Sequence, residues 1–499
     1  MKYSKVYSAQ NVFLSAFIIS IETDISNGLH AFSIVGLGDK AVDEAKDRVS
    51  AAIKNIGYVS PKQKNQKVVV SLAPADTRKE GSHFDLGIAV GYLVASGEIP
   101  PPTEKILFLG ELALDGELRR VYGVLPLTQK AKEMGFKEII VPKINAEEAA
   151  IISDIKVFGA RTLNEVLDHI THKIYLPEQP HTEISYIRPD VHVDMGDIKG
   201  QEIAKRGIEI AAAGGHNIAL YGPPGTGKTM LAKALWGILP PLSPEECIEV
   251  TSIHSVVGTL SKNVITHPPF RAPHHTSSYA SMVGGGTFPR PGEVTLAHRG
   301  VLFLDEFPEF DKAVIESLRQ PLEDRKILIA RAKTAVEFPA DCLLLATMNP
   351  CPCGYFGSTL KECTCTQVEI KMYQKKISGP IIDRIDMWIE VSKVEYEKLS
   401  SNEHIAGSLE SSQKVLSART MQKNRNVYKN SLLSVKDLEH TLDKDAKQVL
   451  TVSAKKLALS ARAYHKTIRI ARTIADLDGK ERVGVDHVLE SLQYRPKNT

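Results

Sequence analysis

The sequence predicts a multidomain α/β protein built around one phosphate-binding loop. At 499 residues the chain is long enough for about two to four domains. A strand-like apolar run over 218–221 leads into a glycine-rich turn, and a helical pattern then continues to Gly237. Strand-like and helical segments also alternate elsewhere, which favours sheets covered by helices. Two further apolar runs, over 301–304 and 343–348, end in polar residues, as buried parallel strands do at a binding edge.

The overall composition is ordinary for a globular protein, with 43% hydrophobic and 24% charged residues. A net charge of +3 is too small to indicate nucleic-acid binding by itself, so any basic surface must be local. The sequence contains no apolar run of the roughly 18 residues that a membrane span needs. The apolar stretch over 12–21 is followed at once by acidic residues and has no small-residue cleavage site. We therefore expect a buried strand here, in a cytoplasmic protein with no membrane partner.

The turn after the first apolar run matches the G-x-x-x-x-G-K-[ST] pattern of phosphate-binding loops. Its glycines let backbone N–H groups curl around the β- and γ-phosphates, and the helix that follows offers its positive N-terminus. We predict that Lys228 contacts these phosphates and that the Thr229 hydroxyl binds Mg²⁺. The predicted ATP-binding residues are Gly222, Pro223, Pro224, Gly225, Thr226, Gly227, Lys228 and Thr229.

The two later apolar runs supply further groups that ATP hydrolysis needs. Asp305 and Glu306 follow the first of these runs directly. We expect Asp305 to hold Mg²⁺ through water and Glu306 to orient and polarise the attacking water. Asn349 follows the second run and fits a residue that senses the γ-phosphate by hydrogen-bonding the lytic water. A simple Asn-Pro turn is the alternative for Asn349.

Four of the six cysteines cluster directly after this asparagine, as Cys351, Cys353, Cys363 and Cys365. Four thiolates form the ligand set of a closed tetrahedral Zn²⁺ site, which is structural rather than catalytic. The C-x-C pairs are tighter than the usual C-x₂-C pairs, so free thiols or redox-active pairs are the alternatives. A zinc ion here would pin an insertion beside Asn349.

The order of the phosphate loop, the acidic strand and the sensor strand resembles that of AAA+ ATPases. Two segments narrow the resemblance, FRAPHHT over 270–276 and GGGTFPRPGE over 284–293, and they precede GVLFLDEFPEF over 300–310. Together they resemble the magnesium-chelatase-like AAA+ group and, within it, the ComM/YifB family, over essentially the whole chain. Neighbouring residues on a strand point in opposite directions, so His274 and His275 are expected to have structural or subunit-contact roles rather than to share a metal ion.

The resemblance implies roles for several basic residues. A hairpin over 326–338 would enter the central pore of a ring, with Arg331 and Lys333 as contacts to DNA phosphates; a solvated hairpin tip is the alternative. Arg384 matches an arginine finger that is lent to the neighbouring subunit, and a local salt bridge with Asp383 or Asp386 is the alternative.

Arg462 matches the second sensor arginine of a lid helix over 460–475. Arg469 and Arg472 of the same helix are expected at an interface or in solvent. In related ATPases, a segment placed like 197–201 shapes an adenine pocket, although it could equally begin a helix.

The resemblance also implies the domain organisation: a Lon-protease-like domain of ribosomal S5-type fold over 1–175, a linker over 176–197, an AAA+ core over 198–395 and a helical lid over 396–499. LAPADTRKEG over 72–81 and GELALDGELR over 110–119 carry the first-domain resemblance. Active members of that class use a Ser–Lys dyad.

Neither position of that dyad is filled here. The nucleophile position falls on His83, with Ser82 one place early, and the lysine position falls on Leu125. We therefore expect a proteolytically inactive scaffold, and an ATP-dependent protease is disfavoured.

For the whole chain, the resemblance implies a homo-hexameric AAA+ ATPase and DNA helicase with ATP sites shared between subunits. It would use ATP, Mg²⁺ and structural Zn²⁺, act on single-stranded and branched DNA, and promote branch migration during homologous recombination in natural transformation. The alternative is a magnesium-chelatase-like ATPase that remodels a partner protein for metal insertion, which would need no basic pore.

Overall fold

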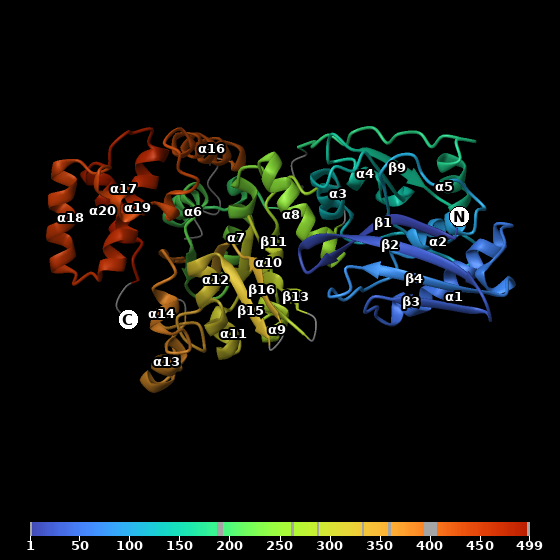
Figure 1. Ribbon diagram of the computed structural model, residues 1–499. Coiled ribbons are helices and arrows are strands. Elements are labelled where there is room, and N and C mark those ends of the chain that lie inside the picture. Colours follow the sequence, from blue (N-terminus) through green and yellow to red (C-terminus); the bar gives the residue numbers. More distant parts are fainter. Residues whose placement is uncertain are drawn as a thin grey trace. The chain divides into compact units, whose positions relative to one another are not determined.

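The computed structural model describes residues 2–186, 193–260, 264–286, 289–331, 334–357, 361–393 and 407–496 (Figure 1). The chain divides into two compact units. The first comprises Met1–Ser185 and Cys247–Ile265, and the second comprises Tyr186–Glu246 and Thr266–Thr499. Among the helices described, none combines the length and apolar character that a membrane crossing requires.

In the first unit, seven described strands form a mixed sheet in the order β3-β4-β2-β1-β5-β8-β9. The pairs β1–β2 and β2–β4 are antiparallel, and the other pairs are parallel. The elements are β1 (Tyr3–Val12), β2 (Ser15–Asn27), β3 (Ala31–Val35), α1 (Lys40–Asn55), β4 (Gln66–Ala73), α2 (Asp85–Ala95), β5 (Ile106–Phe108), β6 (Glu111–Leu112), β7 (Leu118–Arg119), α3 (Val124–Glu133), β8 (Glu138–Pro142), α4 (Ala146–Ala149), β9 (Lys156–Ala160) and α5 (Leu163–Ile170).

Helix α2 is buried along its whole length, in keeping with its uninterrupted apolar sequence. Two glycines let it approach β2 closely. A Cβ at Gly87 would lie 2.6 Å from Cδ1 of Ile21, and one at Gly91 would lie 3.0 Å from Oγ1 of Thr23. The helix therefore fills the core of this unit, where no larger side chain at either glycine would fit.

One expectation for this unit was wrong in detail. The stretch over 12–21 is the turn and second strand of the β1–β2 hairpin, because Phe13 adopts a left-handed conformation with φ of 59°. Only one face of β2 meets the core, so Phe17 is 45% exposed while Ile19 is buried. Farther along the chain, residues 108–112 are split between β5 and β6, since the Gly110 N–H turns away to donate to the His83 carbonyl at 3.0 Å.

Helix α8 (Pro244–Val257) begins in the second unit and continues in the first. Its Ser255 hydroxyl donates to the buried carboxylate of Glu148, and the Gly123 N–H donates to the Ser255 carbonyl at 3.1 Å. Glu148 also accepts from the Leu125 N–H at 3.0 Å. The chain thus leaves the second unit after Glu246 and returns at Thr266, an exchange that a boundary near residue 175 does not include.

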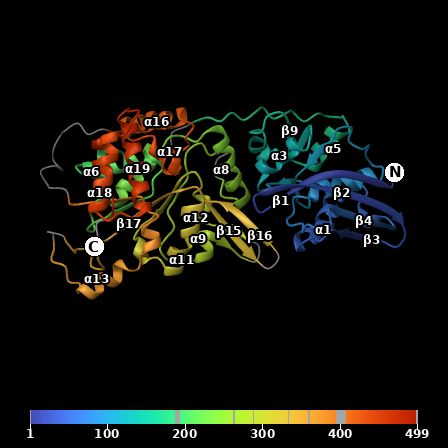
Figure 2. The same cartoon turned by 60° about the vertical axis from the view of Figure 1, so that its left-hand side comes forward.

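In the second unit, five described strands form a parallel sheet in the order β11-β14-β17-β10-β18. The hairpin expected over 326–338 is present as β15 and β16, and both views place it beside α9 and α12 (Figure 1, Figure 2). The elements are α6 (Glu202–Gly214), β10 (Ile218–Tyr221), α7 (Lys228–Ile238), β11 (Phe270–Arg271), α9 (Tyr279–Val283), β12 (Gly284–Gly285), β13 (Arg290–Pro291), α10 (Glu293–Leu296), β14 (Val301–Leu304), α11 (Lys312–Ser317), α12 (Arg319–Asp324), β15 (Lys326–Arg331), β16 (Thr334–Pro339), β17 (Leu343–Met348), α13 (Gln367–Gln374), α14 (Gly379–Ile382) and β18 (Met387–Glu390).

A buried carboxylate anchors the amino ends of this sheet. Asp341, just before β17, accepts from Arg299 at 2.8 Å, from Lys429 at 3.3 Å and from Arg325. Burial by itself would raise the pKa of Asp341, but the three cations together hold it well below its usual range. Because these cations precede β14, begin the hairpin and belong to the C-terminal helices, one carboxylate ties all three regions together.

The C-terminal helices are α16 (Ser408–Asn424), α17 (Val435–Glu439), α18 (Lys444–Lys456), α19 (Ala461–Leu477) and α20 (Val485–Gln493). Helix α6 of the sheet layer packs against α16 and α19 (Figure 1). The helix expected over 460–475 is present as α19.

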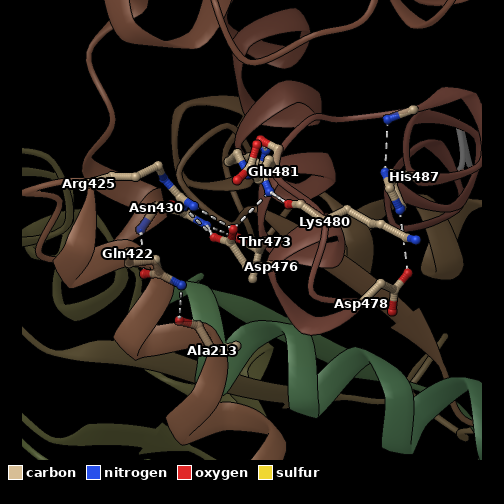
Figure 3. Close-up of polar contacts among 12 residues, drawn as sticks. Ala213, Gln422, Arg425, Asn430, Thr473, Asp476, Asp478, Lys480, Glu481 and His487 are labelled. Atoms are coloured by element: carbon tan, nitrogen blue, oxygen red, sulfur yellow. Dashed lines mark hydrogen bonds and ion pairs between the residues drawn. The ribbon is translucent and has the colours of Figure 1, made fainter.

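Arg472 of α19, which was expected at an interface or in solvent, is fully buried. Its guanidinium and that of Arg425 both donate to the buried Asp476 carboxylate, at 2.8 and 2.6 Å. Asn430 donates to the same carboxylate at 2.7 Å, so the charge is fully enclosed by donors (Figure 3). A buried carboxylate with three donors can hold an arginine in the core, a pairing that helical periodicity does not reveal.

This arrangement predicts that Asp476→Asn costs about 3 kcal/mol of stability, because two buried or half-buried guanidinium groups lose their counter-charge. Asp478→Asn, the same change two residues on, should cost less than about 1 kcal/mol, because Asp478 is 41% exposed in its ion pair with Arg206. Urea unfolding followed by circular dichroism measures both. Equal losses for the two variants would contradict the assigned role of Asp476.

Candidate active site

The phosphate loop joins the central strand β10 to helix α7. Gly222 lies so close to the chain after β18 that a Cβ would meet the Val391 carbonyl oxygen at 2.2 Å. Gly225 and Gly227 have φ of 75° and 89°, which glycine adopts without strain. The loop therefore holds the backbone shape that a phosphate cradle requires, and α7 begins at its last residues.

Lys228 folds back over this loop. Its ammonium group donates to the carbonyls of Gly222 and Pro223, both at 2.8 Å, and to Oδ1 of Asn349 at 3.2 Å. Burial lowers the pKa of Lys228, although Asp305 and Glu306 oppose the shift. The cation is thus held by neutral oxygens, for which phosphate oxygens are stronger replacements.

The acidic pair lies at the carboxyl end of the buried strand β14. Thr229 donates through Oγ1 to Oδ2 of Asp305 at 3.4 Å, so the two groups expected at Mg²⁺ are neighbours. Hydroxyl and carboxylate oxygens are the hard donors that Mg²⁺ prefers, and this pair fits the ion by its chemistry.

Thr347 was not singled out from the sequence, yet it organises the acidic pair. Its hydroxyl donates to Oδ1 of Asp305, and its oxygen accepts from the Glu306 N–H at 3.2 Å. It lies within the buried strand β17. A hydroxyl inside an otherwise apolar run was the available signal.

Glu306 itself has a left-handed backbone with φ of 52°. Its Oε2 lies 3.9 Å from Nδ1 of His275, whose ring stacks on that of His274 with centroids 4.1 Å apart. This contact places His275 next to one of the groups expected to act on water. The two histidines are not part of a metal-ligand cluster among the described residues, where the four clustered cysteines alone qualify.

Segment 197–201 contacts the same loop through Gln201. Gln201 precedes α6 in a left-handed conformation, and its amide donates to the Thr226 carbonyl at 3.4 Å and to the Ser392 carbonyl. The segment therefore precedes a helix directly and borders the phosphate loop, and its role in an adenine pocket stays a prediction.

The two arginines predicted to act on the γ-phosphate, Arg384 and Arg462, lie at the Glu323 carboxylate rather than at the phosphate loop. Arg384 donates to the carbonyls of Arg319 and Pro380, at 3.0 and 2.8 Å, and forms an ion pair with Glu323. Arg462 lies 3.5 Å from the other oxygen of Glu323. The local salt bridge considered for Arg384 therefore exists, but with Glu323 of α12 instead of Asp383 or Asp386.

Comparison with known proteins agrees with this architecture. Models for the magnesium chelatase subunit ChlI match residues 194–399 and 21–145, and the model for the C-terminal part of that subunit matches 406–495. Competence protein ComM of Haemophilus influenzae is 41% identical over 99% of this chain and 98% of its own length. The chain belongs to the ComM/YifB family. Its sheet and helical C-terminal region fit the magnesium-chelatase-like AAA+ architecture of that family.

Two further relatives differ in extent. YifB of Salmonella typhimurium, an uncharacterized protein, is 40% identical over 99% of this chain and 97% of its own length. DNA repair protein RadA of Listeria monocytogenes is 42% identical over 84 residues, which are 17% of this chain and 18% of RadA. AAA+ membership implies ATP and Mg²⁺ as cofactors of this ComM/YifB protein.

The cysteine cluster of this family member is compact. The four sulfur atoms all lie within 4.8 Å of one another, with Cys351–Cys353, Cys353–Cys363 and Cys351–Cys363 separations of 3.4, 3.5 and 3.8 Å. Disulfide sulfurs lie about 2.05 Å apart, whereas Zn–S bonds of about 2.3 Å in a tetrahedron separate sulfurs by about 3.8 Å. The spacing fits four ligands around one metal ion.

Backbone groups also favour thiolates in this cluster. The N–H of Tyr355 is the main cause that lowers the pKa of the Cys353 thiol to about 5. Backbone N–H groups also act to lower the pKa of the Cys363 and Cys365 thiols, but burial and the neighbouring thiols outweigh them and raise it. The N–H groups of Phe356 and Cys353 point to Sγ of Cys351 and Cys365, at 3.3 and 3.4 Å. The cluster therefore offers soft donors of the kind that Zn²⁺ binds.

Other expected residues lie elsewhere or outside the described chain. Lys333 is not among the described residues, and of Arg331 the backbone alone is described, as the end of β15. In the first unit, Ser82 donates to Glu111 and the Leu125 side chain is buried, while burial lowers the pKa of His83 to about 4.

The position of Thr347 predicts the effect of removing its hydroxyl. Thr347→Val keeps the shape of the buried side chain but frees the Asp305 carboxylate and the Glu306 amide. We expect kcat for ATP hydrolysis to fall about tenfold or more, with a change of less than about threefold in nucleotide Kd. Thr347→Ser, which keeps the hydroxyl, is the matched control. Steady-state ATPase assays and titration with a fluorescent nucleotide separate the two effects, and a normal kcat for the valine variant would contradict the assignment.

Proposed function

We propose that this chain is a hexameric ATP-driven DNA helicase that promotes branch migration during homologous recombination in natural transformation. The observation that carries the proposal is the convergence of Lys228, Thr229, Asp305 and Asn349 at one sheet edge, with Arg384 engaged elsewhere. A hydrolytic site that lacks its own arginine finger is completed by a neighbouring subunit.

In this site, bound Mg²⁺ would neutralise charge on the β- and γ-phosphates. Lys228 exchanges its loop carbonyls for phosphate oxygens, while Thr229 and Asp305 provide oxygen ligands for the ion. Thr347 holds Asp305 in place and fixes the Glu306 backbone, so that the Glu306 carboxylate is aimed at the attacking water. Asn349, already within 3.2 Å of the Lys228 ammonium, is placed to contact the same water or the γ-phosphate.

The DNA step rests on two supports. The described hairpin β15–β16 is paired in register from Lys326↔Pro339 to Arg331↔Thr334, so Arg331 ends its first strand. A backbone contact there suits a motor that moves without reading sequence. The name of one partial relative also points to DNA, since the DNA repair protein RadA matches 17% of this chain.

Two structural parts complete the proposal. The four cysteines hold Zn²⁺ as a structural site. The first unit is a Lon-like scaffold without protease activity, in which Ser82 is bound to Glu111 and the expected lysine position is a buried leucine, Leu125. We infer that this unit serves ring assembly or DNA recruitment.

The second candidate function is remodelling of a partner protein for metal insertion. It is favoured by the family models that match the chain, which are those of a magnesium chelatase subunit. Such a remodeller needs a metal-binding partner subunit and no basic pore, so DNA dependence of the ATPase separates the two functions.

The DNA-motor proposal predicts that single-stranded DNA raises the ATPase rate several-fold and that Arg331→Ala/Lys333→Ala weakens this stimulation. Losing two phosphate contacts should flatten the salt dependence of DNA binding by about 0.7 per contact. Lys326→Ala removes a positive charge at the base of the same hairpin, where Lys326 pairs with Glu337 at 3.0 Å, and it should leave both properties unchanged. ATPase rates with and without DNA, at low and moderate salt, provide the measurement. No stimulation of the unaltered protein would instead favour the remodeller.

The shared-site proposal predicts partial recovery when two inactive variants are mixed. Random rings of Lys228→Ala and Arg384→Ala subunits should regain about a quarter of their sites, since a head-to-tail interface then pairs an intact loop with an intact finger. Lys228→Ala mixed with Glu306→Gln is the matched control, with no recovery expected, because both groups belong to one chain's sheet edge. The ATPase rate of each mixture is measured. Absence of recovery in the first mixture, or equal recovery in the control, would refute a site shared in this way.

A further inference from the structure

The cysteine cluster lies directly against the phosphate loop. Gly354, between the two cysteine pairs, has φ of 86° and donates its N–H to the Cys351 carbonyl at 3.0 Å. A Cβ at Gly354 would lie 2.8 Å from Cδ of Pro224 and 3.8 Å from Cγ of Asn349. One turn of the cysteine segment therefore touches the loop that would cradle phosphate and the side chain that would sense it.

The segment that follows the cluster touches Asn349 a second time. Helix α13 begins after Cys365 with a capping box formed by Thr366 and Glu369. Its Tyr373 is buried, and burial raises the pKa of the Tyr373 hydroxyl while the neighbouring Asn349 backbone opposes that shift. Asn349 is thus held on both sides by elements whose positions depend on the cysteine segment.

Among the described residues of the cysteine segment over 351–365, the buried ones are Cys351 and Gly354. Cys351 is buried, but Cys353, Cys363 and Cys365 are partly exposed, and all four thiols are free of disulfides. A short segment with so small an apolar core is ordered mainly by a bound metal ion. The free energy of metal binding then stabilises the folded shape of the segment. The position of Gly354 against Pro224 should therefore depend on the ion.

We propose that the metal ion held by the four cysteines positions the phosphate loop and Asn349, so that metal occupancy sets the affinity of the site for nucleotide. Gly354 is the positioning residue that transmits this effect to Pro224. The proposal rests on the metal and nucleotide sites proposed above, but it makes no use of DNA. Failure of the motor proposal in DNA assays therefore leaves it unaffected, and the converse also holds.

Two glycines of the same segment allow a matched test. Gly354→Ala and Gly357→Ala both place a side chain at positive φ, 86° and 74°, so their backbone strain is similar. The added methyl group meets Pro224 at Gly354, whereas no atom of the described residues lies within 4 Å of it at Gly357. Both full-length variants should keep the zinc content of the unaltered protein, about one ion per chain. We expect Gly354→Ala to raise the Kd of a fluorescent ATP analogue about tenfold and Gly357→Ala to change it less than about twofold.

Metal removal tests the same link without a substitution, should Gly354→Ala fold poorly. The full-length protein is stripped with a zinc-selective chelator in excess Mg²⁺, its metal content is measured, and Zn²⁺ is then returned. The nucleotide Kd should rise about tenfold on stripping and recover on reloading. An unchanged Kd in protein verified as stripped, an equal Kd for the two alanine variants, or a purified protein that contains no metal would each overturn the proposal.

Discussion

The parallel register of β17 between β14 and β10 is the constraint on which the site depends. Leu304 pairs with Ala346, so the next residues along the two strands, Asp305 and Thr347, lie level with each other. On its other side Thr347 pairs with Leu220, two residues before the phosphate loop. Because side chains alternate between faces, a slip of one residue would turn the Thr347 hydroxyl away from the carboxylate. The geometry of hydrolysis is thus set by backbone pairing before any side chain contributes.

The opposite ends of the same strands are fixed by charge. Asp341 precedes β17 and binds Arg299, which precedes β14, together with Arg325 at the base of the hairpin and Lys429 of the helical region. Burial is the largest effect on Lys429 and lowers its pKa to about 8, so keeping the Lys429 ammonium charged in this cluster costs free energy. Removing any partner would leave buried charges unpaired. The hairpin and the C-terminal helices therefore share one anchor with the strands that carry the acidic and sensor residues.

The sequence specified the parts of the site that are local in the chain. Each of these parts is recognisable within a few residues of sequence: the glycine-rich loop, the apolar run that ends in acids, and the polar residue after a second apolar run. Their side chains Lys228, Asp305 and Asn349 do lie together. What it could not specify were pairings across the chain. Thr347 matters because of a register, and Arg472 is buried because Asp476 and its donors enclose it.

Contacts between distant parts of the chain also explain two further features that the sequence did not predict. Helix α8 is the next helix after α7 in the sequence, yet its contacts with Gly123 and Glu148 belong to the first unit. Gly354 lies between the two cysteine pairs in the sequence, and its closeness to Pro224 is visible only in the fold. Under the proposed function, Arg384 and Lys228 each have a partner before nucleotide binds. Arg384 is paired with the Glu323 carboxylate and Lys228 with loop carbonyls, and both kinds of partner carry less negative charge than a triphosphate. Each cation can then exchange a weaker partner for a stronger one, so neither has to be buried without a counter-group during the exchange.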